Sequence, residues 1–225
     1  LKQVAKAPSE FDLRARNPKR NVHIGGDAMA FGGVYGPPFV LEGTTRRDGT
    51  FKDFENFCKL AQSFDALDSV GGVVVEPNDL SLDSRYLDMV MAQATLTDKF
   101  FMGNVVTAEN ARDVIAMTEI IHGGRKAITE MPATISLINC NSPLRWDDRM
   151  LDSMREYALA GQPVVFTPFL LMGAMSPVTI PATLLSLLSS IKAGLSKYSP
   201  TKLDFRLGFD FANSLTLPKA SPIFL

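Results

Sequence analysis

The sequence predicts an α/β protein with the architecture of a TIM-type (β/α)8 barrel that is incomplete in this chain. Short apolar segments begin near residues 70, 100, 133 and 163, and each is followed by an amphipathic helical pattern. This step of roughly 30 residues matches the size of a βαβ unit, whose strands are parallel. An open doubly wound sheet has the same alternation and is the alternative architecture.

The first 65 residues do not follow this repeat, so we predict an extension at 1–65 and a partial barrel at 66–225. The segments Val22–Ile24, Ala28–Val34 and Phe39–Leu41 are β-like and predict a β-hairpin in the extension. Thr50 and Asp53 form a capping box, which predicts the start of the first helix. Its apolar residues follow at helical spacing: Phe51, Phe54, Phe57, Ala61 and Phe64.

Four strand–helix units then follow in order. The predicted strands are Val70–Val75, Phe100–Val106, Ala133–Asn139 and Pro163–Phe169, and the helices after them begin near Asp83, Ala108, Asp147 and Thr179. A complete barrel needs about 250 residues. Because the chain also starts at Leu1 and ends without a terminating helix, we expect a fragment of a longer protein.

Composition limits the function classes. The chain has 225 residues, 46% of them apolar and 21% charged, which is enough to bury a sizeable core. Its apolar runs are shorter than the roughly 20 residues of a membrane-spanning helix. The net charge of −1 gives no field that favours nucleic acid. The amino end lacks the apolar centre of a signal peptide, and only Cys58 and Cys140 occur, so we expect a cytoplasmic protein.

Polar residues follow the predicted strands. Glu76 follows one strand, Asn139 and Asn141 stand at the end of another, and Thr167 lies near the end of the last. The carboxyl ends of parallel strands are where barrel enzymes bind ligands, so these side chains are candidates for a binding site. The alternative for the asparagines is that they cap helices and shape turns.

The familiar catalytic and metal-binding patterns are absent from the sequence. His23, His122, Cys58 and Cys140 show no metal-ligand spacing, so no metal site is expected. His23 has no acid partner that the sequence reveals. No G-x-S-x-G elbow, Walker loop or G-x-G-x-x-G turn occurs. Cys140 is the best thiol candidate, but a small buried cysteine is the expected reading, and the catalytic residues are unassigned.

Eight short motifs carry a family resemblance when taken together. They are Gly36-Pro37-Pro38, Val75-Glu76-Pro77, Arg85-Tyr86-Leu87-Asp88-Met89, Leu96-Thr97-Asp98-Lys99, Asn141-Ser142-Pro143-Leu144, Gly161-Gln162-Pro163-Val164-Val165, Thr167-Pro168-Phe169 and Gly173-Ala174-Met175-Ser176-Pro177-Val178-Thr179. Between about Phe11 and Thr179 the chain resembles the trimethylamine methyltransferase family, which includes glycine betaine methyltransferases. The resemblance implies a TIM-like barrel that passes a methyl group from an amine to the cobalt of a separate small corrinoid protein, with no cofactor bound by this chain.

The resemblance also directs the choice of site residues. Aromatic faces and carboxylates hold cationic nitrogen, so Phe31, Tyr35, Phe169 and Glu76 are the candidates for binding the amine. Asn139, Asn141 and Thr167 would orient a substrate carboxylate or line the corrinoid entrance, where Gly173 and Ala174 are also expected. The alternative is that Phe31 and Phe169 are core residues and that Tyr35 is a turn residue.

The match breaks after Thr179. The segment 180–207 departs from the family pattern, which returns in part at Asp210–Lys219. We interpret this interval as a local reading-frame error or a divergent insertion, and a single clean frame in the resequenced DNA would reject the first. Trimethylamine enzymes of the family use pyrrolysine, which does not occur here. A quaternary amine such as glycine betaine is therefore favoured over trimethylamine.

Two other function classes stay open. An aldolase-type barrel lyase would need a lysine at the carboxyl end of a strand, whereas Lys99 precedes its strand. A non-catalytic module that binds a small cation is the third reading. The expected partners are the amine and the corrinoid protein, and a homo-oligomer is a further possibility.

Overall fold

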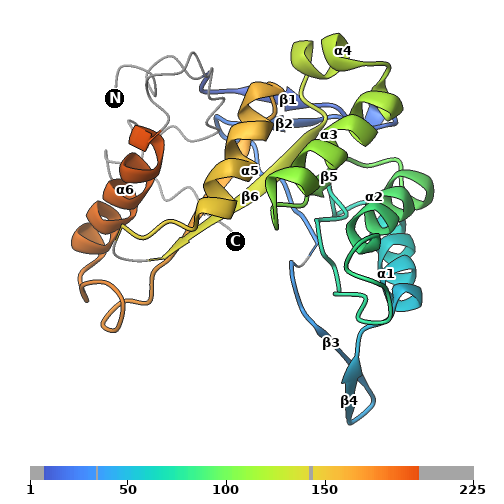
Figure 1. The fold of residues 1–225 in the computed structure, drawn as a ribbon, viewed down its shortest axis with the longest axis horizontal. Coiled ribbons are helices and arrows are strands. Elements are labelled where there is room, and N and C mark those ends of the chain that lie inside the picture. The colour runs from blue at the N-terminus through green and yellow to red at the C-terminus, as the bar shows by residue number, and fades with distance from the viewer. Residues whose placement is uncertain (1–7, 34, 142–143, 198–225) are drawn as a thin grey trace.

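The computed structural model describes residues 8–33, 35–141 and 144–197 (Figure 1). Its central element is a parallel sheet of β5 (Phe101–Gly103), β6 (Thr134–Asn141) and β7 (Val164–Phe169), in that order. The predicted alternation of parallel strands and helices is therefore confirmed, and with it the α/β class. The predicted motif at 210–219 lies outside the described residues.

The sheet of the described residues does not close into a barrel. The segment predicted as the strand Val70–Val75 runs beside β5 without forming a regular strand, so that prediction was wrong in detail. Ser69 bridges both Gly32 and Phe100 in parallel orientation, and Met102 N donates to Gly71 O at 2.9 Å. Gly71 has a φ of 89°, which no pleated strand accommodates, and this interrupts the ladder.

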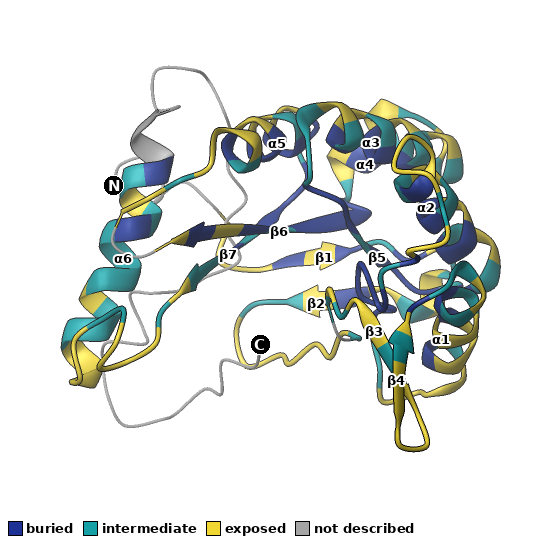
Figure 2. Ribbon diagram, turned by 60° about the horizontal axis from the view of Figure 1, so that its bottom comes forward, coloured by how far each residue is buried: buried dark blue, intermediate teal, exposed yellow. Residues whose placement is uncertain are grey.

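The helices are α1 (Phe51–Ser63), α2 (Arg85–Leu96), α3 (Ala108–His122), α4 (Arg125–Glu130), α5 (Asp148–Leu159) and α6 (Ile180–Lys197). In Figure 2, α2 to α5 lie over one face of the sheet, α1 lies at one side, and α6 stands near the carboxyl end of β6. The largest apolar cluster lies between α3, α5 and the sheet, where Ile138 and Phe166 meet Val114 and Met154. The sequence did not predict α4, which begins directly after two glycines with positive φ, Gly123 and Gly124.

Trp146 fixes α6 to the sheet. Its ring meets the Phe166 ring edge-on at 5.7 Å between centroids, and its Nε1 donates to Ser190 O at 2.9 Å. Gly194 lies so close to the Trp146 ring that a Cβ at that position would overlap it. The last described helix is therefore held by one aromatic side chain that needs a glycine opposite.

A hairpin of β1 (Phe11–Leu13) and β2 (Val22–Ile24) covers part of the other face of the sheet. Phe11 and Leu13 pack there against Phe100 and Ile135, all of them buried. A short 3₁₀ helix, η2 (Pro18–Arg20), joins the two strands. These contacts close the face near the amino ends of the strands, and within the described residues its carboxyl end is left uncovered.

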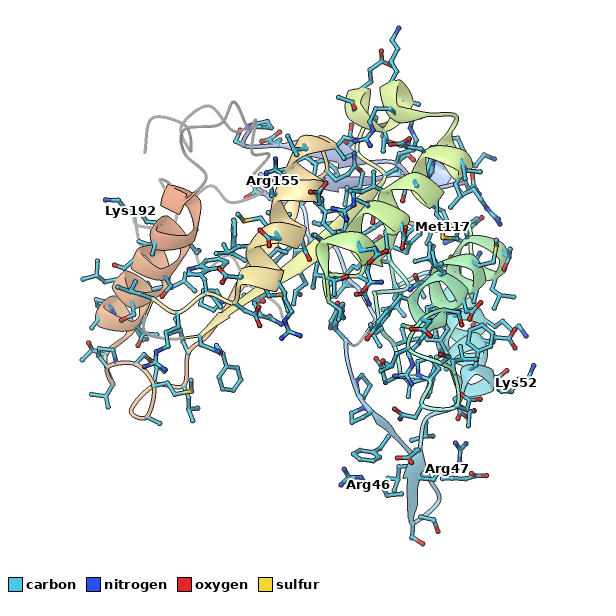
Figure 3. All side chains as sticks on the ribbon, in the orientation of Figure 1. Arg46, Arg47, Lys52, Met117, Arg155 and Lys192 are labelled. Atoms are coloured by element: carbon cyan, nitrogen blue, oxygen red, sulfur yellow. The ribbon has the colours of Figure 1, made fainter. Side chains whose placement is uncertain are left out.

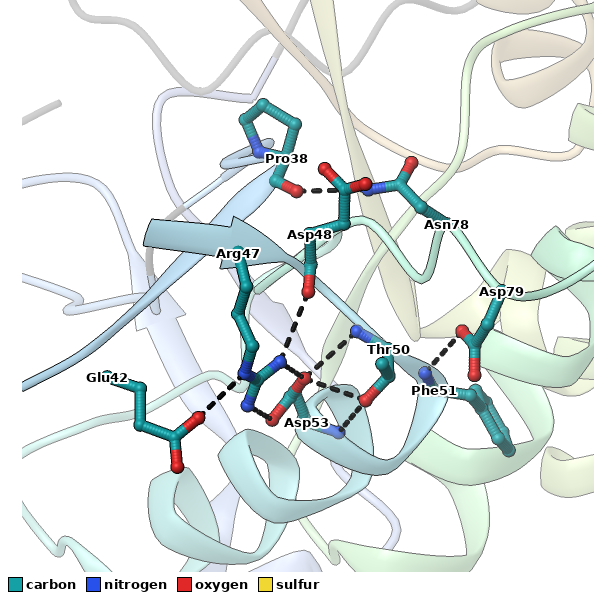
Figure 4. A network of polar contacts seen from close by, with 9 residues as sticks. All are labelled: Pro38, Glu42, Arg47, Asp48, Thr50, Phe51, Asp53, Asn78 and Asp79. Carbon is teal, nitrogen blue, oxygen red and sulfur yellow. Dashed lines mark hydrogen bonds and ion pairs between the residues drawn. The ribbon is translucent and has the colours of Figure 1, made fainter. Parts of the chain in front are cut away.

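A second hairpin, β3 (Phe39–Glu42) with β4 (Thr45–Asp48), stands away from the body (Figure 1). The predicted capping box holds its base, because Thr50 accepts from Asp53 N and the Asp53 carboxylate accepts from Thr50 N (Figure 4). Arg47 donates to the same carboxylate at 2.6 and 2.9 Å. These donors hold the pKa of Asp53 well below its usual range, chiefly through Arg47.

Within the described residues, none of the helices has the length and apolar character needed to span a bilayer.

We predict that Asp53→Ala loosens the junction between β4 and α1. Losing a cap interaction costs about 1 kcal/mol, so backbone amides at 50–53 should exchange with solvent roughly five-fold faster by hydrogen-exchange mass spectrometry. Because the folded pKa is lowered, this stabilisation is present above the unfolded value of about 3.9 and is lost only at lower pH. The wild-type amides should therefore stay protected down to about pH 4. Lys52→Ala, on the exposed neighbour, is the control, and equal exchange in both variants would contradict the prediction.

Candidate functional site

The carboxyl ends of β6 and β7 present four polar or aromatic side chains on the face that carries no helices. The two strands pair with Asn139 opposite Thr167 and Asn141 opposite Phe169. Successive side chains of a strand point to opposite faces. Ile138 and Phe166 belong to the helix-side core, so Asn139, Asn141, Thr167 and Phe169 share the other face.

A hydrogen bond orients the Asn139 amide. Thr167 Oγ1 donates to Asn139 Oδ1, and it also lies 3.4 Å from Ile138 O. With its oxygen engaged, the Asn139 amide keeps two N–H donors on Nδ2. The Asn139 side chain is exposed, so this pair can present N–H donors to an anionic group of a ligand.

Phe169 and Asn141 lie one step further along the same face. Phe169 is 65% exposed, and Leu171 and Met172, which follow it in the chain, are 58% and 52% exposed. The Asn141 backbone exchanges two hydrogen bonds of 2.9 Å with Arg145, which fixes the end of β6. An exposed ring beside an amide fits a small ligand with a cationic and an anionic end, because aromatic faces attract cations.

Glu76 and Tyr35 belong to a second group, which lies against α2. Glu76 Oε1 accepts from Arg85 at 3.0 Å and lies 3.5 Å from the Tyr86 hydroxyl. Burial raises the pKa of Tyr35 to about 12, with smaller contributions from Tyr86 and Glu76. The Glu76 carboxylate is therefore already paired with a buried guanidinium.

Two glycines make room for the tyrosines of this second group. A Cβ at Gly72 would overlap the Tyr35 ring, and one at Gly103 would overlap the Tyr157 hydroxyl. Tyr157 is fully buried and donates to Asn104 O at 2.7 Å. A cavity of about 10 Å³, room for a single water, remains beside the Tyr35 and Tyr86 rings, where Met89, Val90 and Gln93 of α2 also line it. The group is a packed layer and not an open ligand pocket.

The remaining predicted residues lie elsewhere. Phe31 precedes the Gly32–Ser69 bridge, at the amino ends of the parallel segments, and its backbone N–H donates a hydrogen bond to the Asp68 carboxylate. Gly173 and Ala174 form a turn after β7, where Gly173 N donates to Ser176 O and Ala174 N to Leu171 O. The structure thus brings together four of the predicted residues, pairs Tyr35 with Glu76 in a separate group, and leaves Phe31 at the opposite end.

Sequence reasoning missed the partners of Glu76. Arg85 and Tyr86 entered the sequence analysis only as part of a family motif. The sequence around Tyr157 shows an aromatic residue at helical spacing and nothing else that indicates its role. His23 was also misjudged, since Asp12 and Glu10 lie 2.8 and 3.5 Å from its ring nitrogens and raise its pKa, chiefly through Asp12. Asp12 faces His23 across the β1–β2 pair, a register that the sequence does not reveal.

The cysteines are not poised as nucleophiles. Both are buried, and burial raises the pKa of Cys140 to about 11 and that of Cys58 to about 12. Cys140 lies on the helix side of β6, away from Asn139. Over the described ranges no cluster of three or more His, Cys, Asp or Glu side chains could hold a metal ion.

Comparison with known proteins gives a consistent picture. The family model for trimethylamine methyltransferase (MTTB) matches residues 1–196. A glycine betaine methyltransferase of Desulfitobacterium hafniense (strain Y51) is 39% identical over 195 residues, which cover 86% of this chain and 41% of that protein. A trimethylamine methyltransferase MttB of D. hafniense (strain DSM 10664 / DCB-2) is 26% identical over 189 residues, 81% of this chain and 37% of that protein. The chain therefore spans about two fifths of the length of these relatives.

We predict that Cys140 resists alkylation. With a pKa near 11, only about one thiol in a thousand is ionised at pH 8, and the thiolate is the reactive form. Iodoacetamide labelling of native protein, followed by peptide mass spectrometry, should be slow and should rise about ten-fold per pH unit until the protein unfolds. Denatured protein is the control, and rapid labelling of native Cys140 at pH 7 would contradict the prediction.

Proposed function

Because the chain belongs to the trimethylamine methyltransferase family, we propose that the complete protein transfers a methyl group from a quaternary amine of the glycine betaine type to a corrinoid carried by a separate protein. The observation that supports it best is the helix-free face of β6 and β7, where Asn139 and Thr167 lie beside the exposed Phe169 ring, an arrangement that suits a small zwitterion. The 39% identical relative bears the name of the same substrate.

The site supplies binding and orientation. The Nδ2 donors of Asn139 would hold the substrate carboxylate, and the Phe169 ring would face the trimethylammonium group. Asn139 lies opposite Thr167, two residues before Phe169, so Asn139 and Phe169 are diagonal neighbours on adjacent strands, roughly 8 Å apart between Cα atoms. Such a spacing suits a molecule whose charged ends are separated by one methylene, because the carboxylate must also fit beside the Asn139 amide and the ammonium beside the Phe169 ring.

The methyl acceptor is expected from outside the chain. The reduced cobalt of the partner's corrinoid would supply the electron pair for the new bond to the methyl carbon, and the C–N bonding pair would stay on nitrogen, so that a neutral tertiary amine would leave. No protein acid is needed, because the nitrogen loses its charge when the bond breaks. The uncovered carboxyl end of the face leaves room for a partner to approach, which fits this role. Closure of the sheet into a full TIM barrel by further strands of the longer protein is part of the proposal.

The lyase alternative has less support. Lys99 Nζ donates to Ala61 O and Phe64 O at 2.7 and 2.6 Å, at the end of α1, and it lies before β5. A lysine engaged there stabilises the carbonyl end of a helix. Burial lowers its pKa, but its position is at the end of the strands away from Asn139. The non-catalytic cation-binding module would use the same site residues, so only a transfer assay separates it from the enzyme.

The proposal predicts that the complete protein methylates a reduced corrinoid protein with glycine betaine as donor. The change in the absorption spectrum of the corrinoid measures this transfer. Trimethylamine, tested in parallel, should be a poorer donor because it lacks the carboxylate. If calorimetry shows that the protein binds betaine but no methyl group is transferred to any of a panel of corrinoid proteins, the binding module is supported and the enzyme is rejected.

Asn139→Ala should raise the KM for glycine betaine by about ten- to a hundred-fold, since a hydrogen bond to a charged group contributes about 1.5–3 kcal/mol. With choline, which has the same ammonium but no carboxylate, the change should be less than three-fold. Thr167→Val should act in the same direction by releasing the Asn139 amide, and Asn56→Ala, on exposed α1, is the matched control. Equal losses with both donors would contradict the assigned role.

A further inference from the structure

The β3–β4 hairpin, residues 39–48 and called the arm below, projects at the same end of the molecule as the candidate site. The segment before it runs parallel to 69–76, because Gly36 N donates to Val73 O and Glu76 N to Pro37 O. The bridge from Ser69 to Phe100 is also parallel, as are the pairs β5–β6 and β6–β7. The arm therefore leaves the body at the carboxyl ends of these segments, where Asn139 and Phe169 lie.

The two faces of the arm differ. On the inner face Val40 packs against the cluster around α1, and Arg47 binds Asp53 and Glu42. The outer face carries Phe39 and Leu41 from β3 opposite Asp48 and Arg46 from β4. Figure 3 shows Arg46 and Arg47 projecting to opposite sides, with Arg46 on the side where β6 ends and α6 lies. Leu41 is 71% exposed, so this face is uncovered among the described residues.

The arm is held rigidly at its base. Gly49 is buried, a Cβ there would overlap Val75, and its carbonyl accepts from Asn78 N at 2.9 Å. Asn78 Nδ2 also donates to Pro38 O at 3.0 Å, on the other side of the hairpin (Figure 4). A surface fixed in this way loses little conformational freedom when it binds, which favours association.

The outer face has the chemistry of a protein contact. The Arg46 guanidinium lies 3.6 Å from the centre of the Phe39 ring, a cation–π contact that fixes the charge beside an apolar surface. Aromatic and arginine side chains are the types that most often carry binding energy at interfaces. Arg46 would pair with a carboxylate of the partner, and Asp48 on the same face would favour one orientation over its reverse.

We propose that the arm is a docking element for the corrinoid-carrying methyl acceptor, and that Phe39, Leu41 and Arg46 contact an acidic and apolar patch of that protein. This inference rests on the proposed function, which requires a partner to come to the carboxyl end of the strands and leave again. The face offers four side chains, whose combined area is far less than the roughly 800 Å² that each partner buries in a stable interface. A surface of this size suits a transient partner better than a permanent second copy of the chain.

The test uses the complete protein with the double variant Leu41→Ser/Arg46→Ser. Its KM for the corrinoid protein should rise at least ten-fold, and the Kd measured calorimetrically without amine should weaken to match, while the KM for the amine stays within two-fold. The matched control is Ile120→Ser/Lys126→Ser, which removes an exposed apolar residue and a lysine from α3 and α4, away from the arm. Wild-type KM for the corrinoid protein should also rise with salt, and this dependence should flatten in the Arg46 variant.

The outcomes separate the two levels of inference. If the wild type neither binds nor methylates any corrinoid protein, both the proposed function and the docking role are overturned. If the wild type transfers methyl groups and the arm variant keeps its acceptor KM within two-fold, the docking role alone is overturned. If light scattering shows a wild-type dimer that the arm variant loses while its acceptor KM is unchanged, the arm is a contact between copies and the docking role is likewise rejected.

Discussion

The parallel pairing of β6 with β7 is the constraint on which the candidate site depends. Its register sets Asn139 beside Thr167 and sends Ile138 and Phe166 to the apolar core under the helices. A slip of one residue would exchange the two sets, burying asparagine side chains and exposing apolar ones. The burial of apolar surface therefore selects the register, and this register brings Thr167 within hydrogen-bond distance of Asn139.

The sheet next to β5 is maintained by side chains where the ladder fails. Ser69 Oγ donates to Phe100 O and accepts from Gly71 N, and Gln93 Nε2 from α2 donates to Gly71 O and Gly72 O. The glycines that prevent a regular strand also admit the Tyr35 ring over Gly72. A regular strand is thus replaced by the packing of a large ring, and the buried Gln93 amide donates to the Gly72 carbonyl and adds a second bond to that of Gly71.

The sequence predicted what local chemistry determines. The capping box at Thr50 and Asp53, the strand predicted at Ala133–Asn139 and the polar ends of β6 and β7 all depend on near neighbours in the chain, and the structure contains each of them. Glu76 shows the limit. An acidic residue after a strand reads as a ligand group, yet its pairing with Arg85 depends on how α2 lies against the sheet, which no periodicity encodes. The same holds for Asp12 and His23, whose contact needs the register of β1 with β2.

The β1–β2 hairpin determines from which end a ligand can reach the helix-free face of the sheet. Phe11 and Leu13 cover this face over Phe100 and Ile135. Towards the carboxyl end of β6 on the same face, Leu137 is half-buried and Asn139 is exposed. The change from apolar to polar side chains along β6 therefore coincides with the end of the hairpin's cover. Burying an asparagine under that cover would leave its amide unpaired, at a cost of about 1–3 kcal/mol. Polar groups can consequently stand on this face only beyond the hairpin, and the site is confined to the end at which the arm also projects.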